Sequence, residues 1–320
     1  MSTIFEDDDL KDIHSRLADR DSTVRRIALL ELADWAGDEH APLFVAALRD
    51  PAPEVRAEAA RALEAFESTD GVAGLVQLLS DADETVRQSA AHSLSELKDP
   101  ASAAELLPHA ANASAFVRIA VLRALRELRV AGSFTPALAA LDDADAAVRR
   151  EAVAVLGYLK QDGALAALTN LVSHDPDAEV RRAAVGALGF ATSADALPAL
   201  LDGLRDPAWQ VREEAATTLG KLGLAQAALA LISALEDAYW QVRLRAARSL
   251  GRLRHAAALP ALVLTLRHPI SNLRKEAALA LGEIGGAAAL PALEQLEHDA
   301  DPEVRKAVRL ALSQIRAANA

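Results

Sequence analysis

The sequence contains no cysteine among its 320 residues. This absence excludes disulfides, thiolate zinc sites, iron–sulfur ligation and cysteine nucleophiles, and it fits a protein of a reducing compartment. Aromatic residues are also scarce, at 3% of the chain, whereas hydrophobic residues make up 52%. Most of the hydrophobic residues are alanine and leucine, which favour helices and allow them to pack closely. We therefore expect an all-α fold.

Long apolar runs are missing as well, since none approaches the ~20 residues that a membrane-spanning helix needs. The first ten residues, MSTIFEDDDL, are acidic, whereas a secretory signal peptide begins with positive charge. We therefore expect a cytoplasmic protein that has no membrane partner.

Positive charge is in deficit, because 46 acidic residues face 34 basic ones and give a net charge of −12. Most of the imbalance lies in residues 1–160, which carry 28 acidic and 17 basic residues. Nucleic-acid binding requires clustered basic side chains that displace counterions, so we expect no nucleic-acid partner. The bases are 28 arginines and 6 lysines, a bias that together with abundant alanine indicates a GC-rich bacterial genome.

A short phrase recurs along the whole chain. A Val-Arg or Leu-Arg pair appears every 31 residues, with one step of 32. Five residues before this anchor the chain has an aspartate in eight repeats, and Asn112 and His268 take that position in the other two. The sequence therefore predicts one domain over residues 1–320, built from ten repeats. The anchors are Val24, Val55, Val86, Val117, Val148, Val180, Val211, Val242, Leu273 and Val304.

The sequence pattern within each repeat predicts two helices of 10 to 15 residues. In residues 206–222, an Asp-Pro pair breaks the chain, and Val211, Ala215 and Leu219 then follow at helical spacing. The phrase Leu-Pro-Ala-Leu begins at residues 197, 259 and 290, and proline there is typical of a first helical turn. Helix pairs of this length cannot bury their apolar faces alone, so stacked pairs should form an α-solenoid.

The phrase Asp-Pro-x-x-x-Val-Arg-x-x-Ala-Ala-x-x-Leu-Gly-x-Leu at residues 206–222 resembles the HEAT-like repeat of the phycobilisome-lyase type. The resemblance covers essentially the whole chain and is specific for the fold. It implies a role like those of phycobilin lyase subunits, regulatory and assembly scaffolds, or deoxyhypusine hydroxylases. The hydroxylases hold iron through His-Glu dipeptides, and this sequence has no such dipeptide.

The sequence offers no arrangement that predicts catalysis. Its eight histidines include no pair three or four residues apart, as a metal site on one helix would require. We find no phosphate-binding glycine loop and no Ser/His/Asp pattern, so we expect no catalytic residue, no metal and no cofactor. The principal hypothesis is a non-catalytic scaffold, or an assembly or regulatory factor, that binds another protein. The alternative is a subunit of a phycobilin-lyase-like factor that transfers a chromophore or cofactor.

Residues that depart from the repeat are the candidate partner-binding residues, because a residue present in every repeat serves the architecture. Aromatic residues and arginine are also enriched at binding hot spots. Trp209 and Trp240 share one repeat position, and Arg248 lies on a helix face where no partner is evident. Two alternatives stay open: the indoles could cover neighbouring turns, and the arginine could be simply solvated. The candidates are Tyr158, Phe190, Trp209, Tyr239, Trp240 and Arg248.

We expect the other notable positions of the repeat to serve helix packing and hydrogen bonding between repeats. The recurring Asp and Arg should form a hydrogen-bonded ladder along the stack, and Arg245 should face Glu214 and Glu276. Trp35 and Phe66 stand at a leucine position and should belong to the core. Glycines nine residues after five of the anchors should let adjacent helices approach closely; they are Gly157, Gly189, Gly220, Gly251 and Gly282.

Overall fold

The computed structural model describes residues 3–191 and 194–319, which contain helices and turns but no strand. The chain forms two compact units, residues 1–159 and residues 160–320, which we call the N-terminal and C-terminal units. Each unit is a stack of helical hairpins, and each hairpin has a first helix (A) and a second helix (B). The all-α prediction is therefore confirmed.

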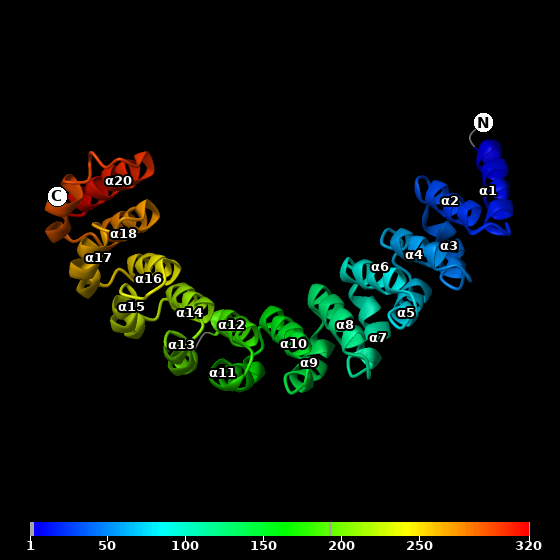
Figure 1. The fold of residues 1–320 in the computed structure, drawn as a ribbon, viewed down its shortest axis with the longest axis horizontal. Coiled ribbons are helices and arrows are strands. Elements are labelled where there is room, and N and C mark those ends of the chain that lie inside the picture. Colours follow the sequence, from blue (N-terminus) through cyan, green and yellow to red (C-terminus); the bar gives the residue numbers. More distant parts are fainter. Residues whose placement is uncertain (1–2, 192–193, 320) are drawn as a thin grey trace. The chain divides into compact units, whose positions relative to one another are not determined.

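In the N-terminal unit the A and B helices form separate layers (Figure 1). The A helices are α1 (Thr3–Leu17), α3 (Ala41–Ala47), α5 (Thr69–Leu78), α7 (Ala103–Leu106) and α9 (Phe134–Ala140). The B helices are α2 (Ser22–Ala33), α4 (Pro53–Ala62), α6 (Glu84–Ser95), α8 (Ala115–Leu128) and α10 (Ala146–Leu159).

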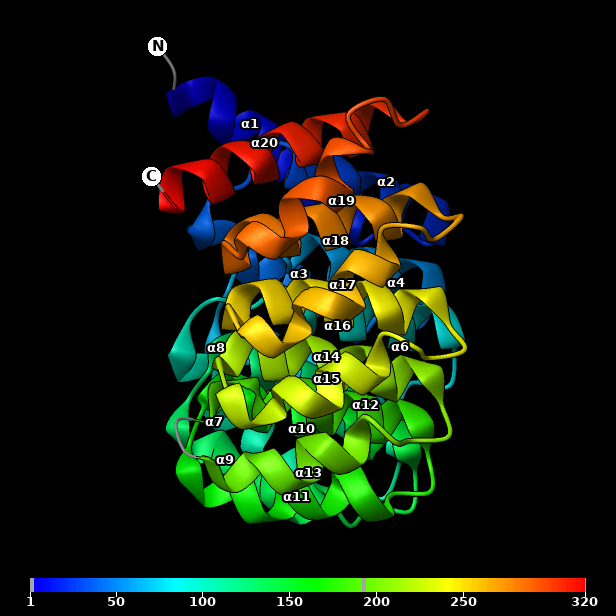
Figure 2. The ribbon, with the colours of Figure 1, turned by 90° about the vertical axis from the view of Figure 1, so that its left-hand side faces the viewer.

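The C-terminal unit repeats this arrangement, and Figure 2 shows its A helices stacked one above another. The A helices are α11 (Leu165–His174), α13 (Leu197–Gly203), α15 (Ala228–Ala234), α17 (Leu259–Thr265) and α19 (Leu290–Glu294). The B helices are α12 (Ala178–Ala187), α14 (Trp209–Leu222), α16 (Trp240–Leu253), α18 (Ser271–Ile284) and α20 (Pro302–Ala318).

Most A helices are shorter than the predicted 10 to 15 residues. Helix α17, for example, has 7 residues and follows a 3-10 turn at Ala256–Ala258. Its Pro260 lies in the first turn, as predicted. Leu259, the residue before this proline, is itself in α conformation, and α15 follows a 3-10 turn at Ala225–Ala227 without any proline, so the 3-10 entry does not depend on proline. Pro108 has no backbone N–H to continue the hydrogen bonds of α7, which ends after four residues and passes into a 3-10 turn at Leu107–His109.

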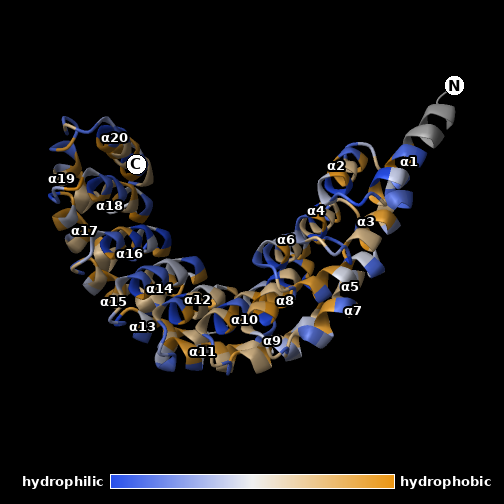
Figure 3. Cartoon of the chain, turned by 45° about the vertical axis from the view of Figure 1, so that its right-hand side comes forward, coloured by the Kyte–Doolittle hydropathy of each residue, from blue (hydrophilic) through white to orange (hydrophobic). Residues whose placement is uncertain are grey.

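The core lies between the two helix layers of each unit, and each helix carries both apolar and polar positions (Figure 3). Phe66 is buried as expected, and its ring stacks on Phe44 with centroids 5.2 Å apart. The expectation for Trp35 is wrong, because its side chain is 43% exposed. It lies beyond the end of α2 and meets only the edge of His40 among the described rings.

Three glycines allow the close helix packing that the sequence predicted. A Cβ on Gly251 would come within 2.8 Å of the Cα atom of Ala280, and one on Gly282 within 2.8 Å of the Cα of Ala311. A Cβ on Gly220 would likewise clash with the side chain of Ser249. Gly189 does not follow this pattern, since its nearest neighbour would be a side-chain carbon of Thr218 at 3.7 Å.

Candidate functional site

Consecutive repeats are joined by a series of Arg–Asp pairs that we call the turn ladder. The arginine after the anchor donates Nε and Nη2 to both carboxylate oxygens of the aspartate in the following repeat, over 2.6 to 2.9 Å. Its Nη1 donates to a backbone oxygen of its own repeat, as from Arg56 to Asp50 at 2.8 Å. In the Arg118–Asp143 pair only Nη2 donates to the carboxylate, at 2.9 Å, and Nε makes an ion pair at 2.7 Å. The predicted ladder is confirmed, with a partner one repeat further on. The described pairs are Arg25–Asp50, Arg56–Asp81, Arg118–Asp143, Arg181–Asp206, Arg212–Asp237 and Arg274–Asp299.

At Asp81 and Asp299 the pairing favours the ionised carboxylate. Hydrogen bonds from Arg56 lower the pKa of Asp81, and hydrogen bonds from Arg274 lower the pKa of Asp299. The guanidinium takes one lone pair of each carboxylate oxygen, and a backbone N–H donates to Oδ1 as well, as from Asp83 to Asp81 at 2.9 Å. The recurring acids therefore serve the architecture.

A second series of contacts, which we call the helix ladder, runs between neighbouring B helices. An arginine six residues after one anchor contacts the residue three after the next anchor, so the partners are 28 residues apart. Sequence reasoning missed this ladder, although the 28-residue separation of arginine and acceptor was its signal. The described contacts are Arg61 to Ser89 at 3.1 Å, Arg123 to Glu151 at 3.0 Å, and Arg248 to Glu276 at 3.0 and 2.6 Å.

Two sequence expectations about arginines are thereby corrected. Arg248 does have a partner, since both its Nε and Nη2 donate to the buried carboxylate of Glu276. Arg245 donates from Nε to Glu213 at 3.0 Å, and not to Glu214 or Glu276. Glu213 precedes the expected Glu214 by one residue, and Glu276, the other expected partner of Arg245, is taken by Arg248.

Tyr158 lies in the last turn of α10 and is 46% exposed. The guanidinium carbon of Arg129 lies 4.9 Å from the centroid of its ring, and that of Arg126 lies 6.0 Å away. Arg129 adopts a left-handed conformation at the end of α8, which carries its side chain to this ring. Both contacts are within the range of a cation–π interaction.

Trp209, Tyr239 and Trp240, which we call the aromatic edge, lie at the turns between A and B helices. The rings of Trp209 and Tyr239 stack with centroids 5.5 Å apart and planes inclined by 15°. Arg212 lies 5.7 Å from the Tyr239 centroid, so this stack is held against the turn ladder. Tyr239 is 46% exposed and Trp240 is 38% exposed. Trp209 thus covers the turn of the neighbouring repeat, whereas no described aromatic ring stacks on Trp240.

The six candidate residues do not form one surface. Phe190 is half-buried and ends the 3-10 turn at Leu188–Phe190, whereas Trp209 begins α14. A 14-residue helix such as α14 is about 21 Å long, so Phe190 and the aromatic edge lie at opposite ends of the B-helix layer. Tyr158 belongs to the N-terminal unit. Within the C-terminal unit, the structure brings the residues of the aromatic edge together.

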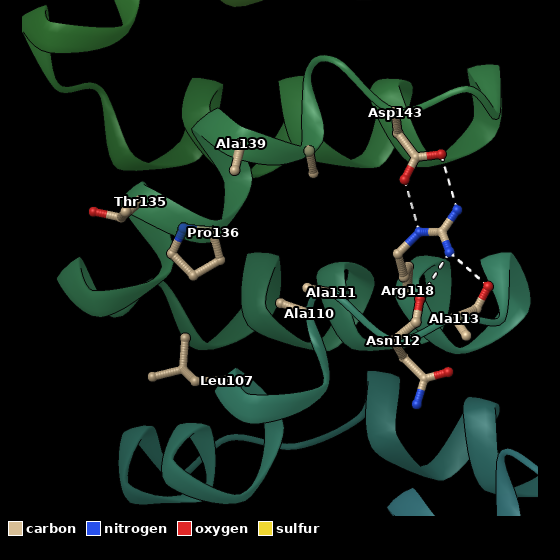
Figure 4. Close-up of a pocket in the computed structure, with 11 residues that line it drawn as sticks. Leu107, Ala110, Ala111, Asn112, Ala113, Arg118, Thr135, Pro136, Ala139 and Asp143 are labelled. Atoms are coloured by element: carbon tan, nitrogen blue, oxygen red, sulfur yellow. Dashed lines mark hydrogen bonds and ion pairs between the residues drawn. The ribbon is translucent and has the colours of Figure 1, made fainter.

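A cavity of about 550 Å³ opens beside the break at Pro108 (Figure 4). Its walls are mostly small or apolar side chains such as Leu107, Pro136 and Ala139. The charged side chains that line it, Arg118 and Asp143, are joined in the turn ladder. The charged groups of the cavity are therefore committed to the turn ladder, and Thr135 and Asn112 are the remaining polar residues of its lining.

Within residues 3–191 and 194–319, histidine, aspartate and glutamate side chains form no group of three that could hold a metal ion. None of the helices there combines the length and the apolar character needed to cross a bilayer.

Comparison with known proteins identifies the repeats. The family profile described as HEAT repeats matches residues 10–71, 41–126, 134–220, 174–237 and 228–313. No curated protein matches the sequence. The recognition of HEAT-type repeats from the sequence is therefore confirmed.

Several solved structures are similar. An engineered protein is 23% identical, with 96% of this chain and 99% of that chain covered and a TM-score of 0.54. Kap95p, in a structure that concerns its binding to RanGDP, is 14% identical with a TM-score of 0.68; the match covers 95% of this chain and 49% of Kap95p. This chain thus spans about half the length of Kap95p. The complex of CpcE and CpcF of phycocyanin lyase from Nostoc sp. PCC7120 is 25% identical, with 67% and 94% covered and a TM-score of 0.45. The first two likenesses show the α-solenoid fold.

Proposed function

The chain belongs to the HEAT-repeat family, and from this premise we propose that it is a non-catalytic scaffold that binds another protein through the aromatic edge. The observation that carries the proposal is the exposure of Tyr239 and Trp240, at 46% and 38%, on a turn where most other repeats have small or polar residues, Trp209 and Ile270 being the exceptions. The repeats fold without these rings, so their presence calls for a reason other than folding.

The geometry of the aromatic edge suits a docking surface. Tyr239 is held from one side by Trp209 and approached by Arg212, so it loses little freedom when a partner covers it. Rigid aromatic side chains bury a large area at low entropic cost, which is why they dominate binding hot spots. Arg248 is not part of the proposed docking surface, because its guanidinium is bound to the carboxylate of Glu276.

Single alanine variants of the two indoles test the proposal. The protein is first used to capture its partner from the native host, and the affinity of that partner is then measured by calorimetry. We expect Trp240→Ala to weaken binding by about 2 kcal/mol or more, as for a hot-spot residue, without changing the free energy of unfolding. Trp209→Ala should weaken binding and also lower stability, because it removes the stack on Tyr239.

Trp35→Ala is the matched control, since Trp35 is exposed to a similar degree, 43%, but lies in the N-terminal unit. It should leave binding unchanged. Full affinity in a folded Trp240→Ala variant would remove the aromatic edge from the proposal. A captured partner that carries a bilin chromophore would instead favour the chromophore-transfer alternative.

A further inference from the structure

His268 interrupts the turn ladder in the C-terminal unit. Among the described residues, no carboxylate lies within ion-pair distance of Arg243, because His268 stands where Asp237 and Asp299 stand in the adjacent repeats. The guanidinium has turned in response. Its Nε, rather than Nη1, donates to the backbone oxygen of Asp237, and its Nη1 lies 3.2 Å from Nε2 of His268.

The hydrogen bonds of His268 leave two donors facing each other. The backbone N–H of Ile270 donates to Nδ1 of His268 at 3.1 Å, as the N–H of Tyr239 donates to a carboxylate oxygen of Asp237 at 2.8 Å. A neutral imidazole that accepts at Nδ1 carries its proton on Nε2. That N–H and the Nη1–H of Arg243 then point at one another without an acceptor between them. An anion from outside the chain would accept from both.

The surroundings of this pair favour an anion. A groove of about 330 Å³ contains Arg243 and His268 together with Arg267, which is exposed and makes no ion pair within the described residues. Glu236 is the one acid that lines the groove, so positive charge is in excess. Arg274 also lies beside His268 but is taken up by Asp299 in the turn ladder.

We propose that Arg243, Arg267 and His268 form a carboxylate-binding site, filled by an aspartate or glutamate side chain of the partner protein. The incoming carboxylate would occupy the place that the chain's own aspartate holds at most other steps, and its planar oxygens match the guanidinium fork. Trp240 precedes Arg243 by one helical turn on α16, so the site adjoins the aromatic edge. Exposed Leu264, at 67%, extends the groove with apolar surface for the residues beside that acid.

The site is testable without the partner, so it depends on the proposed function only for the source of the carboxylate. The protein with ¹³C-labelled histidine is titrated with glutarate, or with inorganic phosphate, at constant ionic strength in sodium chloride. The His268 signal is assigned from its absence in His268→Asp. We expect it to shift with saturation on adding glutarate and to respond more weakly to phosphate.

Two further readouts follow from the charges around the ring. Burial, Arg243 and Arg274 lower the pKa of His268 in the free protein, and bound glutarate should raise that pKa because it stabilises the imidazolium. Arg243→Gln should weaken glutarate binding by about tenfold through the loss of a charge-assisted hydrogen bond. Arg205→Gln is the control for net charge, because Arg205 is exposed and pairs with Asp202 in the same unit.

His268→Asp should restore the missing ladder pair. We expect this variant to unfold at a higher temperature than the wild type and to be no longer stabilised by glutarate, because the site is then filled from within. A wild-type chain without a saturable response, or Arg243→Gln with unchanged affinity, would overturn the proposal. Tighter binding of phosphate than of glutarate would overturn the carboxylate assignment. None of these results bears on the scaffold proposal, which the Trp240 variant tests with the partner itself.

Discussion

Replacement of Gly282 by alanine measures how closely the B helices of the C-terminal unit approach. The added Cβ would lie 2.8 Å from the Cα and 3.0 Å from the Cβ of Ala311 on α20. Gln314 also lies close, but its side chain can turn away. The backbone of α20 cannot, so the two helices must separate. Overpacking of this kind costs about 1–3 kcal/mol, and the better helix propensity of alanine returns about 1 kcal/mol. We expect a net loss of about 1 kcal/mol.

Gly189→Ala is the matched variant, because Gly189 occupies the same repeat position and its added Cβ would meet only Thr218 at 3.7 Å. That distance is an ordinary van der Waals contact, so the variant should be neutral or gain up to about 1 kcal/mol from reduced freedom of the unfolded chain. Urea unfolding followed by far-UV circular dichroism compares the two. The reasoning is refuted if Gly282→Ala is as stable as the wild type, or if both variants shift the midpoint equally.

Two further predictions concern the turn ladder. Asn112→Asp should add the carboxylate that Arg87 lacks, since Arg87 already donates to the backbone oxygen of Asp81 at 2.8 Å. The variant should gain up to about 1 kcal/mol in urea unfolding, and an unchanged midpoint would contradict a ladder role for that position. The pKa of Asp81 is lowered in the folded protein by its hydrogen bonds from Arg56. Its contribution to stability is therefore present above about pH 4 and lost as pH falls below that. The urea concentration at the unfolding midpoint should decrease when the pH is lowered from 5 to 3, and an unchanged midpoint would contradict this.

The sequence predicted the features that recur in every repeat. The period of 31 residues, the helical spacing of Val211, Ala215 and Leu219, and the ladder of Asp and Arg are local patterns repeated many times. Repetition separates such patterns from chance, and helix geometry then places them. The fold class and the structural role of the recurring acids followed from this.

Features that depend on the packing of one repeat against the next were predicted less well. Arg248 lacked a partner in the sequence because Glu276 is 28 residues away and meets it only when two B helices lie side by side. Trp209 and Trp240 share one repeat position but differ in their surroundings. The ring of Trp209 meets Tyr239 in the next repeat, whereas the position equivalent to Tyr239 in the repeat after Trp240 is Ile270.

The turn ladder also determines how the chain can change in length. Where the ladder is complete, a repeat supplies an aspartate to the repeat before it and an arginine to the repeat after it, as Asp237 pairs with Arg212; Asn112 and His268 mark the two exceptions. Duplication or deletion of a whole repeat of the complete kind therefore keeps these charges paired, whereas an insertion of a few residues between Asp237 and Arg243 would separate a guanidinium from the turn that it anchors. Growth or loss of this protein in evolution should proceed in steps of one complete repeat.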